Sequence, residues 1–443
     1  MLNPLQDNPF LQVEFIQKVV TDIVISNPQY TVIDTIIPDR DQDPSLGTTI
    51  QWDVDVYDDG GMTPAVDVGA ESPILQGGGA RQLRFSPPHF REKVTLDGTD
   101  ILNLRQLGTI NQQRNMAELV MKWTARLKRR LDNRRLWYKW QAVQSTAPLA
   151  LEGVGTNQNF DYSSVGYHTG IGGASWDAIG ATILDDIIDF ISEFREAATI
   201  PNAMYFGTTI LNALLTDATT PPAAGVPSIG GMIQSQIGYD VNPNNIFNPM
   251  PGQEGIITFM EKLFAGIRFV YNPFGPVVTL KTLSVGAVGA GPTSFACAGN
   301  YQLFAINDVV TLAYPDGTKF TCIVTALTPS TGLATLSHAL PFTVAVPKGS
   351  IIRKRYEFID FDKVVLFADM PSGQEGGQVQ AEYVSVANVH VDSGFDNPQS
   401  GVGIRLIRHF DDDPPRAEII GSQSAGLVVY YDEGPWAAHT VIF

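Results

Sequence analysis

The chain is poor in residues that build covalent or metal-stabilised frameworks. It has two cysteines, Cys297 and Cys322, and six histidines in 443 residues. Two cysteines cannot form a disulfide framework for so long a chain, so a reducing compartment and buried free thiols are expected. The histidines are scattered, and even the pair His390 and Asp392 reads as surface polar residues. We therefore expect no bound metal and no cofactor.

Long apolar runs and positive charge are also scarce. No stretch approaches the roughly 18 apolar residues of a membrane span, and the start, MLNPLQDNPF, lacks the features of a signal peptide. Lys and Arg number 29 against 46 Asp and Glu, which gives a net charge of −17. This balance excludes a uniformly basic nucleic-acid-binding protein and predicts a protein without a membrane segment.

Catalytic motifs are missing as well. The sequence has no GxSxG, no GxxxxGK[ST] and no HExxH. The triple glycine at 77–79 is not followed by a helical pattern and reads as a flexible loop, and the acidic run at 411–413 reads as a solvated turn or a contact for a basic partner. We expect no catalytic residues and no enzymatic activity.

What the chain does contain is typical of a loop-rich, strand-heavy globular protein. Hydrophobic residues make up 44% and charged residues 17%, with 41 Gly and 29 Pro. The length allows roughly two to four structural units. Apolar residues spaced four apart from Leu11 to Ile23 predict an amphipathic helix. The β-branched stretch 29–38 predicts extended backbone, and the polar stretch after it predicts a surface turn, so the N-terminal region reads as an arm.

Residues 49–84 form the next distinct segment. Ile50, Trp52, Val54 and Val56 alternate with polar residues, which predicts a half-buried strand. A Gly- and Pro-rich stretch separates it from a second alternating run at 81–85, so the segment predicts a long β-hairpin too poor in apolar residues for its own core. Residues 49–80 contain no Lys or Arg but six acids, which we expect to contact a neighbouring copy: Asp53, Asp55, Asp58, Asp59, Asp67 and Glu71.

The strongest local signal is a long helix predicted over residues 111–145, which contain no Gly or Pro. Residues 111–140 hold nine basic and two acidic residues, a net charge of +7 that leaves −24 on the rest of the chain. Like charges at i, i+4 repel, so an external anion would relieve them. Intramolecular salt bridges, nucleic-acid phosphates and the acidic segment of another copy all remain open as partners. The candidate contact residues are Lys122, Arg126, Arg129, Arg130, Arg134 and Arg135.

The remainder alternates helical and extended patterns. A helix is predicted from an N-cap at Ser175 to about Ala198, followed by a strand and a helix over 202–217. Another helix precedes a strand at 267–271. Residues 276–350 change to short β runs, with Pro315, Asp316 and Gly317 as a hairpin turn, which predicts an inserted all-β module. Strand patterns then continue to the C-terminus.

The order of these segments resembles the major capsid proteins of tailed bacteriophages, specifically the lambda-type major capsid protein E family with the Hong Kong 97-type fold. The stretches that carry the resemblance are RFSPPHFREKVTLDGTDILNLRQLG, the long basic helix after it, FREAATIPNAMYFGTTILNALL and KVVLFADMPSG. The fold class implied is α+β. The implied division is an N-terminal arm (1–48), an extended loop (49–84), a peripheral domain (85–199) with a spine helix (111–145), an axial domain (200–275), the inserted module (276–350) and completion of the axial and peripheral domains (351–443).

The resemblance also implies a function. Hexamers and pentamers of the chain would form an icosahedral shell around double-stranded phage DNA, which is bound without sequence specificity. Portal and scaffold proteins, and a decoration or cement protein, would be partners, and the shell would assemble in the host cytoplasm as the virion capsid. Some relatives cross-link a Lys of the extended loop to a neighbour, but residues 49–80 contain no Lys. An encapsulin-like non-viral shell and a carbohydrate-binding or carbohydrate-active β-rich protein are the alternatives.

Overall fold

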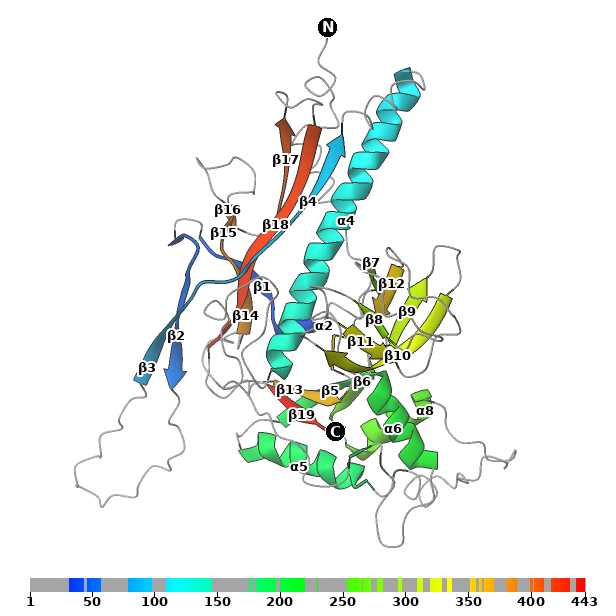
Figure 1. Ribbon diagram of the computed structural model, residues 1–443. Coiled ribbons are helices and arrows are strands. Elements are labelled where there is room, and N and C mark those ends of the chain that lie inside the picture. The colour runs from blue at the N-terminus through cyan, green and yellow to red at the C-terminus, as the bar shows by residue number, and fades with distance from the viewer. Residues whose placement is uncertain are drawn as a thin grey trace, which may run out of the picture. The chain divides into compact units, whose positions relative to one another are not determined.

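The computed structural model consists of two compact units, one formed by residues 1–271 and 359–443 and the other by residues 272–358. Each unit is described by itself (Figure 1). The structure describes residues 32–43, 46–56, 79–97, 109–145, 175–176, 178, 181–196, 200–219, 229, 253–264, 266–271, 277–281, 294–296, 309–313, 319–328, 333–336, 351–355, 358–360, 362–369, 381–388, 399–400, 402–409, 416–430 and 436–442. The mixed helix and strand content agrees with the predicted α+β class.

One sheet of the first unit is organised around a single long strand, β18 (Arg416–Val429). Its first half pairs antiparallel with two strands, β4 (His89–Asp97) and β17 (Gly403–His409). Its second half pairs antiparallel with β14 (Ala381–Ser385), which pairs in parallel with β1 (Asp39–Asp41). A small two-stranded sheet joins β15 (Ala387–Asn388) to β16 (Gln399–Ser400).

The long helix α4 (Thr109–Gln144) packs along this sheet against β18 and β4 (Figure 1). Its buried side includes Val120, Leu127 and Leu131, which recur at helical spacing. The helix comes close to the strand at Gly421 of β18, where an added Cβ would lie 3.2 Å from Leu131 Cδ1. The helix and the sheet are therefore two layers that pack against each other.

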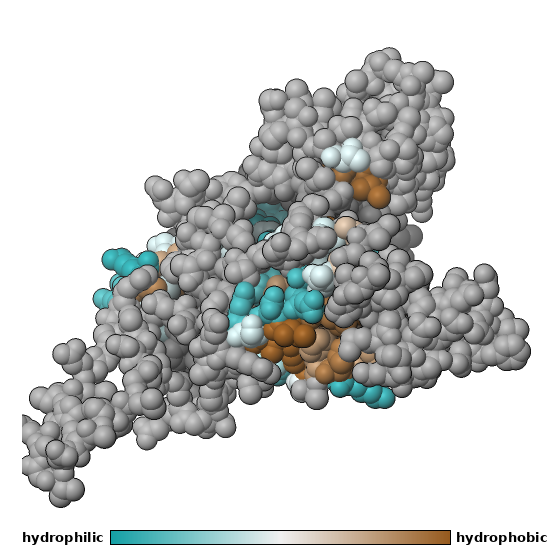
Figure 2. Space-filling view, turned by 90° about the horizontal axis from the view of Figure 1, so that it is seen from below, coloured by the Kyte–Doolittle hydropathy of each residue, from teal (hydrophilic) through white to brown (hydrophobic). Residues whose placement is uncertain are grey.

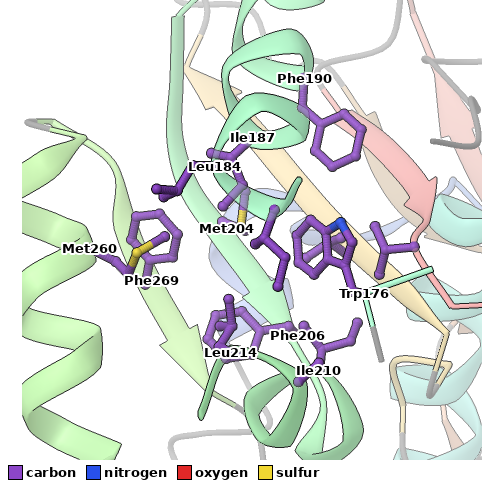
Figure 3. Close-up of a cluster of buried hydrophobic side chains, with 14 of the residues drawn as sticks. Trp176, Leu184, Ile187, Phe190, Met204, Phe206, Ile210, Leu214, Met260 and Phe269 are labelled. Carbon is purple, nitrogen blue, oxygen red and sulfur yellow. The ribbon is translucent and has the colours of Figure 1, made fainter. Parts of the chain in front are cut away.

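A second sheet of the first unit has the order β19 (Trp436–Thr440), β13 (Lys363–Asp369), β5 (Ile200–Phe206) and β6 (Arg268–Tyr271). Three helices belong to this region, α5 (Ile183–Glu196), α6 (Thr208–Thr219) and α8 (Gln253–Leu263). Their apolar side chains and those of the sheet meet in one core, part of which Figure 3 shows. The strand and helix predicted over 202–217 are confirmed by β5 and α6.

The C-terminal end of α4 joins this second sheet. Trp140 is buried and makes edge-to-face contacts with Tyr205 of β5 and Phe367 of β13, at centroid distances of 5.5 Å and 5.9 Å. The end of the helix is capped by Lys363, whose Nζ donates to the Gln144 carbonyl at 2.9 Å. One helix thus connects the cores of both sheets.

The predicted hairpin has a well-defined base. Strands β2 (Ile50–Val56) and β3 (Gly79–Phe85) pair antiparallel over their full lengths. Ile50 and Trp52 are buried, whereas Gln51 and Asp53 are exposed, so the predicted alternation is confirmed over residues 50–53. Trp52 Nε1 donates to the Val429 carbonyl at 2.9 Å, which ties the hairpin base to β18.

The second unit is a six-stranded sheet in the order β7 (Val277–Lys281), β12 (Ile351–Arg355), β9 (Val309–Ala313), β10 (Lys319–Thr328), β11 (Leu333–Leu336) and β8 (Ser294–Ala296). Strands β9 and β10 pair antiparallel, with Ala313 opposite Lys319. This register agrees with the hairpin predicted at Pro315–Gly317.

Two local predictions were wrong. Within the stretch 29–38, expected to be extended, Val32–Ile36 form the short helix α2, and the expected surface turn contains β1. Tertiary contacts outweigh β propensity here, because Lys139 holds Asp34 of this helix. The helix expected from Ser175 begins at Ile183 instead. The backbone N–H of Trp176 donates to the Val441 carbonyl, so Trp176 is hydrogen-bonded to the C-terminal segment and is not part of a helix.

Several large apolar side chains are exposed among the described residues. Leu46 is 65% exposed, Ile188 of α5 is 54% exposed and Met121 of α4 is 45% exposed. From below, the described atoms form a hydrophobic patch that adjoins hydrophilic atoms (Figure 2). The described surface of the chain therefore carries apolar groups that a further contact could cover.

Candidate interaction surface

Six basic residues of α4 form two groups, an outer group of four and an inner group of two. In the turns between 122 and 130, Lys122, Arg126, Arg129 and Arg130 are exposed. The Arg126 guanidinium lies 5.3 Å from the Trp123 ring centroid, and Arg130 Nε lies 2.7 Å from Glu92 Oε2 on β4. We call these four residues the outer basic group. They place several positive charges on the exposed surface of the helix.

The inner group is closer to the C-terminal end of α4 and binds the N-terminal segment. Lys139 is completely buried, and its Nζ lies 2.6 Å from Asp34 Oδ1 and 2.9 Å from Asp39 Oδ1. It also donates to the Ile37 carbonyl at 2.7 Å. Arg135 forms ion pairs with the same two carboxylates, at 2.9 Å from Asp34 Oδ2. A buried cation held by two carboxylates and a carbonyl fixes α2 and β1 against the helix.

Arg134 has a third kind of environment. Its guanidinium lies 4.4 Å from the Trp137 ring centroid and 5.0 Å from that of Phe90 on β4. Such stacking between two rings uses the planar cation for packing as well as for charge. Arg134 therefore helps to fix the helix on the sheet.

Burial also affects the acid of this region. Asp132 of α4 is only 5% exposed, and burial raises the pKa of its carboxyl, an effect that the charges of Arg135 and Lys128 oppose. No described residue donates a hydrogen bond to Asp132 Oδ2. The inner group thus combines well-paired charges with one carboxylate whose charged form is disfavoured.

The six predicted acidic residues are described only in part. Asp53 is exposed on β2, opposite Gln82 of β3, and Asp55 occupies the next position but one on the same strand. The other four, Asp58, Asp59, Asp67 and Glu71, lie outside the described residues. Ile50, Trp52 and Phe85 anchor the hairpin base in a cluster with Val384 and Val428.

Among the predicted contact residues, the structure thus brings four to the surface and two into packed positions. It places Arg135 in intramolecular ion pairs, which is the alternative of internal salt bridges left open above. Sequence reasoning did not single out Lys139, Asp34 or Asp39. The spacing of Arg135 and Lys139 by four residues is the signal that could have drawn attention to them, since both lie on one side of a helix.

The described part of the chain contains neither a metal-ligand cluster nor a membrane-spanning helix. Among them, no group of three or more His, Cys, Asp or Glu is placed to hold a metal ion. No helix in the described part of the chain is long and apolar enough to cross a membrane. The four residues of the outer basic group are exposed cations, which attract anionic groups.

Comparison with known proteins agrees with the resemblance. Residues 17–220 match the family model of phage major capsid protein E, which is the family that the sequence resembles. Proteins of this family are structural components of capsids, so the match supports a shell-forming protein and a component of the virion. No curated protein matches the sequence.

The fold also has similar solved structures. The capsid of cyanophage P-SCSP1u is 9% identical, with a TM-score of 0.39, over 95% of this chain and 90% of that one. The capsid of Myoviridae phage XM1 is 8% identical, with a TM-score of 0.38, over 95% of both chains. An encapsulin of Synechococcus elongatus is 9% identical, with a TM-score of 0.34, over 94% of this chain and 88% of that one.

Proposed function

We propose that this chain, which matches phage major capsid protein E over residues 17–220, assembles into the hexamers and pentamers of an icosahedral shell that encloses double-stranded phage DNA. The family match carries the proposal. Its mechanism is interlocking of copies without turnover, so no catalytic residue is required. The protein would act in the virion capsid after assembly in the host cytoplasm, together with portal and scaffold proteins.

The anchored hairpin supports this proposal physically. Its seven-residue strands, β2 and β3, would extend roughly 23 Å at about 3.3 Å per residue. The base has a core, formed around Trp52 and Phe85. A two-stranded ribbon is marginally stable alone in water, so the rest of the segment 49–84 gains most by lying on a neighbouring copy. We assign it as the extended loop.

The remaining parts follow the same scheme. Residues 1–48 would be the N-terminal arm, and 85–199 the peripheral domain with α4 as its spine helix. Residues 200–275 would be the first part of the axial domain, and 351–443 would complete the axial and peripheral domains. The inserted module, 276–350, would decorate the shell, with or without a cement protein. Exposed apolar side chains such as Leu46 and Ile188 suit contacts that are buried only in an assembly.

The outer basic group would meet an anionic partner. Exposed cations spaced at helical intervals attract phosphates without regard to sequence, and they equally attract carboxylates of another copy. Packaged DNA and the acidic extended loop are therefore both partners of the kind that this surface can bind. Arg135 and Lys139 do not take part, because their charges are paired within the chain.

Assembly can be tested with the full chain. We expect size-exclusion chromatography with light scattering and negative-stain microscopy to show rings, capsomers or closed shells, alone or after co-expression with the proteins encoded beside it. A product that remains monomeric in both conditions would contradict the proposal. Shells that contain protein cargo and no DNA would favour the encapsulin-like alternative.

The role of the outer basic group needs a matched comparison. The triple variant Lys122→Gln, Arg126→Gln, Arg129→Gln should reduce shell yield or DNA retention. The control removes three exposed charges elsewhere in the first unit, at Arg91, Lys262 and Arg268. If both triple variants form DNA-filled shells as well as the natural protein, the outer basic group has no role in assembly or packaging.

A further inference from the structure

The second unit has a charge opposite to that of the rest of the chain. Residues 272–358 contain six Lys and Arg and three Asp and Glu, a net charge of +3, which leaves −20 on the remaining residues. Five of the six basic residues lie on described strands: Lys281, Lys319, Arg353, Lys354 and Arg355. The charge is therefore concentrated on the sheet itself.

Strand register brings four of these positions to one side of the sheet. Residues opposite each other in antiparallel strands share a side, and side changes with each residue along a strand. Lys281 of β7 is opposite Ile351 of β12, which is opposite Ala313 of β9, and Ala313 is opposite Lys319 of β10. Arg353 lies two residues after Ile351 on β12, and Arg355 lies two residues after Arg353. Both are therefore on the same side of the sheet as Lys281 and Lys319.

The same side carries threonines and an exposed isoleucine. Thr279, Thr311 and Thr321 occupy the row that contains Arg353. Ile323 of β10 is 42% exposed and belongs to this side, whereas its neighbour Val324 is fully buried. The opposite side is apolar except for Lys354, with Leu280, Ile352, Leu312 and Phe320 in one row. The basic positions therefore share the side of the sheet on which Ile323 is exposed.

We infer that this side of the second unit, which we call the basic sheet face (Lys281, Lys319, Arg353 and Arg355), binds the acidic segment 53–71 of a second copy of the chain. Across three strand spacings of about 4.8 Å, Lys281 and Lys319 span roughly 14 Å. Arg353 and Arg355 are two residues apart on one strand, as are Asp53 and Asp55 of β2. The inference rests on the proposed assembly, for which it names one contact.

Charge favours this partner over the alternatives. The described positions of β7, β9, β10 and β12 include no Asp or Glu, so the face has no acid of its own in these strands. By contrast, in the outer basic group of α4, Arg130 already pairs with Glu92. Nucleic acid is a weaker fit, because the face positions of these strands include no aromatic residue on which a base could stack.

The contact can be detected by zero-length carboxylate–amine cross-linking of assembled full-length chains. Assembly from a mixture of ¹⁴N and ¹⁵N chains distinguishes contacts between copies from contacts within one. We expect mixed-isotope cross-links from Lys281 or Lys319 to acids within 53–71, at a yield that falls several-fold at high salt. Lys348 of the same unit and Lys122 of α4 are internal comparisons.

A second measurement does not depend on assembly. A labelled peptide of residues 51–72 should bind the unassembled full-length protein, and binding should weaken at least tenfold in the variant Lys281→Gln, Lys319→Gln, Arg353→Gln, Arg355→Gln. The double variant Lys281→Gln, Lys319→Gln covers the case in which the quadruple variant does not fold, and Lys348→Gln is the matched control.

The outcomes separate this inference from the proposed function. Shells whose cross-links join only residues of one isotope, or that favour Lys122 or Lys348, would overturn the basic sheet face while leaving assembly intact. Equal peptide binding by the natural protein and both face variants would do the same. Binding of duplex DNA in place of the peptide, lost in the face variants, would identify nucleic acid as the partner and refute the inference.

Discussion

The base of the hairpin depends on a glycine that leaves room for one aromatic ring. Gly426 of β18 lies opposite Val384, and a Cβ added there would be 2.4 Å from Phe85 Cε1 and 3.3 Å from Pro87 Cβ. Phe85 is only 7% exposed and cannot move without disturbing Ile50 and Trp52. The substitution Gly426→Ala should therefore displace the ring and loosen β2 and β3.

The expected cost is that of overpacking a core, about 1 to 3 kcal/mol. Gly421→Ala is a matched control on the same strand, since its Cβ would meet Leu131 Cδ1 at the milder distance of 3.2 Å. Both substitutions also stabilise the folded protein by about 0.4 to 1 kcal/mol, because alanine lowers the conformational entropy of the unfolded chain. This gain is the same in both variants and cancels in the comparison. The difference between them should isolate the clash with Phe85.

Limited trypsin digestion at low protease concentration measures the effect. Cleavage after Arg81 and Arg84 of β3 requires local opening, so a cost of about 1 to 3 kcal/mol predicts roughly 5- to 150-fold faster cleavage in Gly426→Ala. Adding Phe85→Leu should recover part of the protection, because the smaller side chain makes room. Equal cleavage in Gly426→Ala and Gly421→Ala, or no recovery with Phe85→Leu, would refute the packing argument.

Three further predictions concern buried charge. Lys139→Met should expose the backbone of residues 32–41 to hydrogen exchange, with a loss of about 2 to 3 kcal/mol, whereas Lys93→Met, which removes a side chain that is 56% exposed, should cost less. Asp132→Asn should raise thermal stability at pH 7, because the raised pKa means that the folded state disfavours the charged carboxylate. The gain should disappear on acidification, when the carboxyl is protonated in the folded and the unfolded state alike, and an unchanged gain at acid pH would contradict this. Burial and Glu382 raise the pKa of Tyr430 to about 12, so the folded state favours the neutral phenol, and stability should fall between pH 10 and 12 less steeply in Tyr430→Phe than in the natural protein.

Elements with a strong period were predictable from the sequence. The alternation at 50–56 gave β2 with Ile50 and Trp52 buried, because side chains alternate strictly along a strand. The 36-residue helix α4 was expected within two residues at each end, since an uninterrupted run of helix formers leaves few alternatives. Sequence therefore sufficed where a local rule and the core agreed.

Elements that depend on distant partners were not predictable. The helix Val32–Ile36 forms in a β-branched stretch because Asp34 reaches Lys139, more than 100 residues later in the chain. The backbone N–H of Trp176 donates to Val441 instead of taking part in a helix, and its indole N–H donates to Asp186 of α5 at 2.8 Å. No local pattern contains either partner, so propensity alone led to the wrong element.

The division of the basic residues on α4 was equally hidden, and it changes how their role can be tested. Sequence spacing places Arg126, Arg130 and Arg134 on one side at i, i+4, which suggests a single charged surface. In the structure, Arg134 is packed between Phe90 and Trp137, whereas Arg126 is exposed. A variant that includes Arg134 would lose packing as well as charge, so failure to assemble could reflect a destabilised helix. Substitutions confined to the outer basic group change charge at exposed positions and leave the helix on its sheet. Only these substitutions can connect a loss of assembly or DNA retention to the anionic partner.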